Sequence, residues 1–202
     1  MEQQVWSVLL CQTINLAATD VMPGLGGEPL VALTEGRIAE ATYWQCILER
    51  THWSITVEEL GAGVRHAFRQ PVPGIPELLI GLRRHRLVLF SDQAREWWED
   101  IAATHAFLGL FEHRFLSFAM GQTKRHVETF QRVLAELACG PHNCLFIDDL
   151  LWNVERAESV GIRSHRFTST AALRAFLAQE GQPFQYDHLC AISLAVETCF
   201  PF

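Results

Sequence analysis

The sequence predicts an α/β fold in which helices cover a parallel sheet. Three short runs, 5–10, 87–90 and 144–147, are apolar at nearly every position, as expected for strands that are buried on both faces. Helical patterns lie between these runs, at 78–82, 94–101 and 127–137. This alternation favours right-handed βαβ units, in which ligands bind beyond the carboxyl ends of the strands.

Composition excludes several classes of protein. A chain of 202 residues that is 49% apolar can bury one sizeable core. The net charge of -7 and the lack of a Lys and Arg cluster argue against a nucleic-acid partner. No run approaches the roughly 18 apolar residues that span a bilayer, and the first residues lack a secretory pattern, so we expect a cytoplasmic protein without a membrane contact.

The cysteines and histidines predict neither disulfides nor zinc. The six cysteines include no Cys-x-x-Cys pair, and a core of this size needs no disulfides. None of the nine histidines has the helical spacing beside a glutamate that a zinc site requires. We therefore interpret most cysteines as buried thiols.

The pattern divides the chain into three parts. Residues 1–16 and 74–181 are expected to form the α/β core, and residues 17–73 a helical cap. Within the cap, one helix is expected from near Thr34, and a second begins at the capping box Thr56-Val57-Glu58-Glu59. Residues 182–202 form a tail with little periodicity, and its apolar part, Leu189 to Phe202, would suit a surface for homo-oligomerisation if it is exposed.

The strongest functional signal is a pair of carboxylates at the end of an apolar run. Asp148 and Asp149 follow Phe146 and Ile147, and Asn153 lies about one helical turn further on. Paired acids in this position can hold Mg²⁺ through oxygen ligands. An aspartate at a helix start can equally cap the helix, so Asp149 as a helix cap is the alternative.

Two further polar positions lie after the second apolar run. Ser91 and Asp92 follow Phe90, where a serine can bind an anion or either residue can cap a helix. Lys124 is expected to open a helix, a position that its charge does not favour. Neither signal is specific alone, because a single lysine is usually a solvated surface charge.

Taken in order, these residues resemble the second, third and fourth motifs of the haloacid dehalogenase superfamily. The sequence over residues 5–180 is similar to phosphatase-like members that carry a helical cap after the first strand. The resemblance implies that Ser91, with the adjoining Asp92, and Lys124 bind a phosphoryl group. It also implies that Asp148 and Asp149 hold Mg²⁺, while Lys124 offsets negative charge.

The first motif departs from the family pattern. Cys11 occupies the position of the aspartate nucleophile, and Thr13 that of the aspartate acid and base. A cysteine cannot form an aspartyl-phosphate, and the loss of the carboxylate also removes a ligand from any Mg²⁺. Magnesium would then be held by fewer anionic oxygens than a tight site uses.

The sequence therefore predicts a protein of hydrolase-like fold that binds a small anionic or phosphorylated ligand without ordinary phosphatase activity. Two alternatives stay open. One is an active hydrolase of small molecules, and the other is an enzyme that uses Cys11, activated by Lys124, as a covalent nucleophile. For Cys11 we favour a small apolar residue that fills a strand end, since free cysteine is commonly buried.

Overall fold

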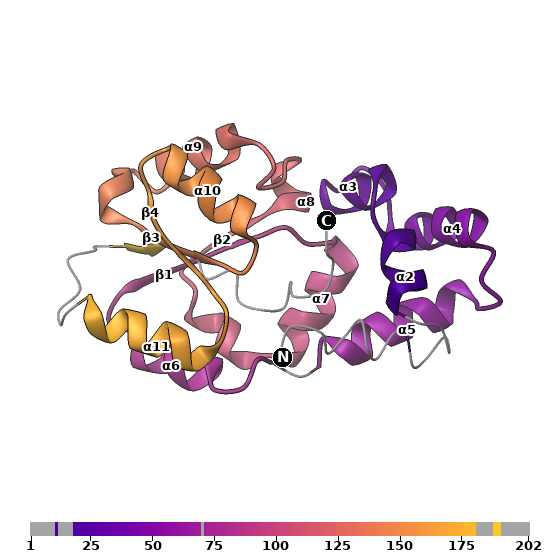
Figure 1. Ribbon diagram of the computed structural model, residues 1–202, viewed down its shortest axis with the longest axis horizontal. Coiled ribbons are helices and arrows are strands. Elements are labelled where there is room, and N and C mark those ends of the chain that lie inside the picture. Colours follow the sequence, from indigo (N-terminus) through magenta and orange to yellow (C-terminus); the bar gives the residue numbers. More distant parts are fainter. Residues whose placement is uncertain (1–10, 12–17, 70, 181–187, 191–202) are drawn as a thin grey trace.

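The centre of the protein is a parallel sheet (Figure 1). The computed structural model describes residue 11 and residues 18–69, 71–180 and 188–190. Its strands are β1 (Arg86–Ser91), β2 (His113–Leu116), β3 (Leu145–Asp148), β4 (Arg163–Arg166) and β5 (His188–Cys190). β1 pairs with β2 on one side and β5 on the other, β3 pairs with β4, and β5 also lies against β3. The three hydrogen-bonded pairs are all parallel, which confirms the predicted fold class.

Helices cover both faces of the sheet. In Figure 1, α9 and α10 lie above the strands, and α6 and α11 lie below them. The elements of this part are α6 (Ile75–Gly81), α7 (Arg95–Thr104), η1 (Ala106–Leu110), α8 (Ser117–Met120), α9 (Val127–Glu136), η2 (Pro141–Asn143), α10 (Leu151–Ser159) and α11 (Thr170–Gln179). Among the described helices, none has the length and hydropathy needed to cross a membrane.

Strand β1 shows how the core divides across the sheet. Leu87 and Leu89 belong to the hydrophobic cluster that α6, α7 and α11 complete, whereas Val88 and Phe90 belong to the cluster on the α9 and α10 side. Because successive side chains of a strand point to opposite faces, an all-apolar run is what a strand between two such layers requires.

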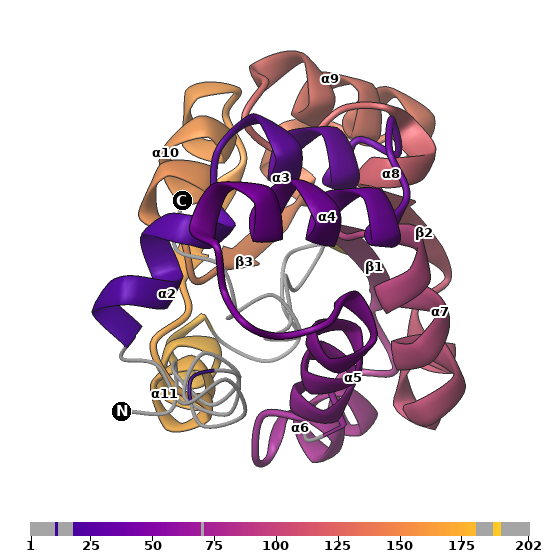
Figure 2. The same cartoon turned by 90° about the vertical axis from the view of Figure 1, so that its right-hand side faces the viewer.

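The four helices from the N-terminal part of the described chain lie to one side of the sheet, shown at the right of Figure 1 and facing the viewer in Figure 2. These N-terminal helices are α2 (Ala18–Leu25), α3 (Glu28–Thr34), α4 (Glu40–Thr51) and α5 (Val57–Ala67). The capping box at Thr56 and Glu59 is confirmed. The helix expected from Thr34 instead begins at Glu40, and Thr34 ends α3. Two helices were missed because Pro23 and Pro29 lie within them, and proline usually indicates a turn.

A buried carboxylate joins the N-terminal helices to the core. Glu40, at the start of α4, accepts hydrogen bonds from Trp44 Nε1 at 3.0 Å and from Trp97 Nε1 of α7 at 2.9 Å. Arg65 of α5 donates to both oxygens of the same carboxylate. The cluster is dry on the tryptophan side, since Glu40, Trp44 and Trp97 are all buried. A charge in this setting is tolerated because each oxygen meets a donor.

A second junction brings two backbones into close contact. Ser117 Oγ of α8 lies 2.5 Å from the carbonyl oxygen of Thr34, to which it donates. Gly36 follows with a φ of +71°, and a Cβ at this position would lie 2.5 Å from the carbonyl oxygen of Phe118. Only glycine suits both the left-handed backbone and this approach. The N-terminal helices are thus fixed against α8 as well as α7.

The prediction that Cys11 ends a first β-strand does not agree with the structure. Residues 5–10 lie outside the described residues, and Cys11 itself has helical backbone, so its predicted position at a strand end is wrong. The place beside β1 and β3 is taken by β5, from the predicted tail. A short apolar run satisfies a helix or a strand equally well, and periodicity alone cannot separate the two.

We predict that Glu40→Gln lowers the free energy of unfolding by about 2 kcal/mol, because an amide nitrogen then faces buried N–H donors and the guanidinium loses its counter-charge. Urea denaturation measures this change. Glu28→Gln is the matched control, since Glu28 is 74% exposed where it pairs with Arg37, and we expect no measurable change there. Equal stability of the Glu40 variant and wild type would contradict the role of this carboxylate.

Candidate functional site

A buried ion pair lies at the carboxyl edge of the sheet. Asp148 ends β3, and Lys124 lies in the turn that precedes α9. Nζ of Lys124 is 2.8 Å from Oδ2 of Asp148, and both side chains are fully buried. The lysine does not open a helix as expected, since α9 begins at Val127. The contact brings the third and fourth motif segments together, although they are far apart in sequence.

Asp148 is held by three kinds of donor. Besides the ammonium of Lys124, its Oδ1 accepts the backbone N–H of Leu150 at 2.9 Å. The amide of Asn153, on the first turn of α10, donates to both oxygens at 3.2 and 3.3 Å. Asn153 therefore positions Asp148, and the negative charge is fully met by donors of this chain.

Asp149 does not cap the following helix. The residue that precedes α10 is Leu150, and no side chain caps it, so the helix-cap alternative for Asp149 is wrong. Asp149 is buried beside Asp148. Its carbonyl oxygen accepts Nε of Arg166 at 3.1 Å, and Arg166 is the partner of Asp148 in the β3 and β4 register. Sequence reasoning missed this arginine, because nothing in its spacing links β4 to the aspartates.

Asp92 joins the turn that contains Lys124 to the end of β1. Both of its carboxylate oxygens accept the backbone N–H of Lys124, at 2.9 and 3.1 Å. Helix capping is not its role or that of Ser91, because Ala94 precedes α7 and no side chain caps that helix. Ser91 is buried at the last position of β1. Contact of Ser91 or Asp92 with a phosphoryl group stays a prediction.

Thr123 was also missed by sequence reasoning. Its side chain is 3% exposed, and its hydroxyl has no hydrogen-bond partner within the described part of the chain. Its carbonyl oxygen accepts the hydroxyl of Thr129 at 2.9 Å, which holds the turn in place. A buried hydroxyl without a partner costs free energy, so a ligand or water that accepts from it would be favoured.

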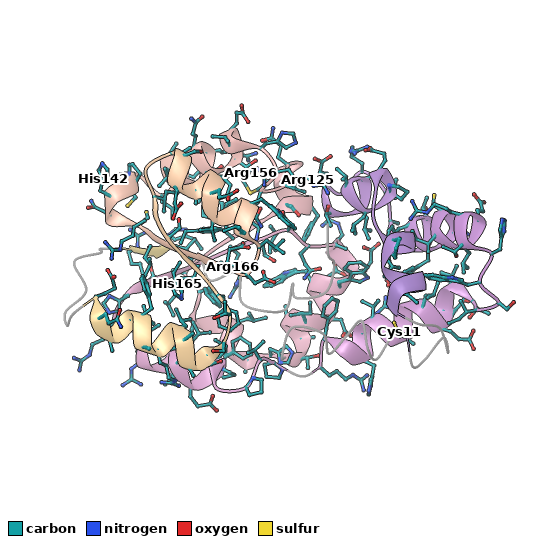
Figure 3. The ribbon with its side chains drawn as sticks, in the orientation of Figure 1. Cys11, Arg125, His142, Arg156, His165 and Arg166 are labelled. Carbon is teal, nitrogen blue, oxygen red and sulfur yellow. The ribbon has the colours of Figure 1, made fainter. Side chains whose placement is uncertain are left out.

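Cys11 lies apart from this edge of the sheet. Figure 3 shows Cys11 away from Arg166 and away from Arg125, the residue that follows Lys124 in sequence. Cys11 is buried in the same hydrophobic cluster as Leu87 and Leu89, and burial raises the pKa of its thiol. An activated nucleophile needs the opposite shift. Thr13, its predicted partner, lies outside the described residues.

The described residues do not form a magnesium site. No group of three His, Cys, Asp or Glu side chains in that part of the chain is arranged to hold a metal ion. Asp148 is already bound by Lys124, Leu150 and Asn153, and Mg²⁺ requires nearly ideal octahedral oxygen ligands. Asp148 as arranged therefore does not fit the ion.

Solved structures resemble the fold of this chain. A haloacid dehalogenase (HAD) family enzyme from Bacteroides thetaiotaomicron has a TM-score of 0.68 at 18% identity, over 86% of this chain and 90% of its own. A HAD-like family hydrolase from Porphyromonas gingivalis has a TM-score of 0.65 at 20% identity, over 85% and 88%. The HAD hydrolase YfnB from Bacillus subtilis, bound to magnesium, has a TM-score of 0.63 at 16% identity, over 88% and 91%. At these identities the likeness shows the fold alone.

No curated protein matches the chain. A family model, haloacid dehalogenase-like hydrolase, matches residues 24–161, which is more than half of the chain. The matched range contains Ser91, Lys124 and Asp148 and begins after Cys11 and Thr13. On this match, the chain belongs to the haloacid dehalogenase-like hydrolase family.

Proposed function

We propose that this protein binds a small anionic or phosphorylated ligand at the carboxyl edge of its sheet and has no ordinary phosphatase activity. The observation that carries the proposal is the buried pair of Lys124 and Asp148 at 2.8 Å. Asp148 faces donors of its own chain on both oxygens. It therefore acts as the counter-ion of the lysine and is not presented as a nucleophile or as a metal ligand.

Donor groups from separate segments support anion binding. Ser91 ends β1, and Thr123 and Lys124 are consecutive in the turn before α9. Asp92 accepts the backbone N–H of Lys124, so the turn and the strand end are held together. Hydroxyl and ammonium groups at the ends of parallel strands suit a phosphate or carboxylate group.

Inorganic phosphate is a suitable probe of anion binding, because a structurally similar enzyme binds it. The HAD family enzyme from Bacteroides thetaiotaomicron was crystallised in complex with magnesium and inorganic phosphate. That complex and family membership favour a second candidate function, a magnesium-dependent hydrolase. The donor set around Asp148 and the position of Cys11 argue against it, and inorganic phosphate with and without Mg²⁺ separates the two.

We expect the wild-type protein to bind inorganic phosphate without Mg²⁺ and to hydrolyse no aryl phosphate above background. Isothermal titration calorimetry measures the first, and release of the aryl alcohol measures the second. Cys11→Asp should gain no activity, because Cys11 is buried away from the site. Magnesium-dependent turnover that disappears in Asp149→Asn would show that the protein is a working hydrolase and would overturn the proposal.

We predict that Lys124→Met lowers the free energy of unfolding by about 3 kcal/mol, because it leaves Asp148 buried without a counter-charge. The double variant Lys124→Met, Asp148→Asn should recover at least half of this loss, since no unpaired charge remains. Denaturation in urea compares the three proteins. If the double variant folds and still binds phosphate as tightly as wild type, Lys124 has no part in binding.

Thr123→Val should weaken phosphate binding about tenfold, which corresponds to the loss of one hydrogen bond to a charged group. Its stability should not fall, because the hydroxyl has no partner among the described residues. Thr123→Ser is the control, since it keeps the hydroxyl and should retain affinity. Equal binding by the valine variant would mean that Thr123 does not contact the ligand.

A further inference from the structure

Two thiols meet where the chain passes from α9 to β3. Sγ of Cys139 lies 3.4 Å from Sγ of Cys144, and both cysteines are reduced. Cys144 is fully buried at the start of β3, whereas Cys139 is partly exposed just after α9. A disulfide has an S–S distance of about 2.05 Å. The sulfurs thus need to approach by little more than an ångström to bond.

The end of α9 holds Cys139 in this position. Ala138 has a φ of +50°, the left-handed conformation that often terminates a helix. The backbone N–H of Cys139 donates to the carbonyl oxygen of Leu134 at 3.1 Å, which completes the terminating turn. The chain then reverses through the short helix η2 (Pro141–Asn143). Backbone geometry therefore brings the two cysteines together, and Sγ of Cys139 also lies 3.4 Å from the carbonyl oxygen of Gly140.

A metal is not the reason for the thiol pair. No group of three His, Cys, Asp or Glu side chains in the described ranges is arranged around an ion, and this includes His142, which lies between the two cysteines in sequence. Two thiolates alone fall short of the four ligands that a structural zinc site uses. In the reduced protein the two thiols share a hydrogen bond, and a disulfide is the covalent bond that two thiols this close can form.

We propose that Cys139 and Cys144 form a reversible thiol–disulfide site that responds to a peroxide. The thiolate of Cys139, the more exposed of the two, attacks a peroxide oxygen; the O–O bond breaks, and hydrogen peroxide leaves one water and a sulfenic acid. The thiol of Cys144 then attacks that sulfur and releases the second water. Two thiols lose two electrons and two protons, and the peroxide is reduced.

The disulfide would add a second link between the α9 segment and β3, which an ion pair already joins at the other end. Lys124 precedes α9 and Asp148 ends β3, so their 2.8 Å contact joins these elements at the sheet edge. The two cysteines join the same elements at the opposite end. Between them, Phe130 of α9 packs on Phe146 of β3 with ring centroids 5.3 Å apart. Oxidation would thus lock α9 onto the strand that carries Asp148.

The test is mass spectrometry of the full chain after treatment with hydrogen peroxide and then N-ethylmaleimide. Trypsin leaves both cysteines in one peptide, between Arg132 and Arg156. We expect this peptide to lack maleimide and to be lighter by two hydrogen atoms. Dithiothreitol should restore labelling of both thiols. The proposal does not depend on what binds at the sheet edge.

Two variants test whether the disulfide forms between these two cysteines, and a melting curve tests whether it stabilises the fold. Cys139→Ser, at the partly exposed position, should fold and form no such disulfide, whereas Cys46→Ser on α4 should oxidise like wild type. Oxidised wild type should melt at a higher temperature than reduced wild type, and the Cys139 variant should show no rise. Full labelling of both cysteines after peroxide, or pairing of either one with another cysteine, would overturn the proposal. An unchanged or lower melting temperature would overturn the locking of α9.

Discussion

Two opposite charges without access to water impose the constraint on which the site depends. Removing Lys124 and Asp148 from water costs several kcal/mol per ion, and their attraction offsets this cost only if the geometry is good and other donors complete the shell. The chain meets the requirement from three sides. Asp92 fixes the backbone of the lysine, and Leu150 and Asn153 fix the carboxylate. The pair thus determines where the turn, the strand end and the first turn of α10 must lie.

The elements that could be predicted from the sequence are those whose buried residues follow a regular pattern of apolar positions along the chain. β1 and β3 are buried at almost every position, and α9 has a regular apolar face, and these patterns are the ones on which their prediction rested. β5, with only three residues, shows no period at all. Its position depends on pairing with β1, a contact between residues far apart in sequence.

The site was predictable as a set of residues but not as a set of contacts. Ser91, Lys124 and Asp148 were recognisable because family motifs keep residue types in order. The bond from the Lys124 backbone to Asp92 depends on how a turn folds back onto another strand. Thr123 gave no signal, since a threonine beside a lysine is unremarkable in sequence. The thiols of Cys139 and Cys144 meet because a left-handed residue reverses the chain, and alanine is not the residue expected there.

The attachment of the N-terminal helices bears on whether the protein turns over a substrate. An enzyme whose helices must move to admit substrate would have to separate Glu40 from Trp97, and the carbonyl of Thr34 from Ser117, in each cycle. Each separation would leave a buried polar group without its partner, at a cost of about 1–3 kcal/mol. Gly36, placed against the carbonyl of Phe118, leaves little freedom for a sliding motion. These contacts therefore oppose a movement of the N-terminal helices away from the sheet, whether a ligand is only bound there or is also turned over.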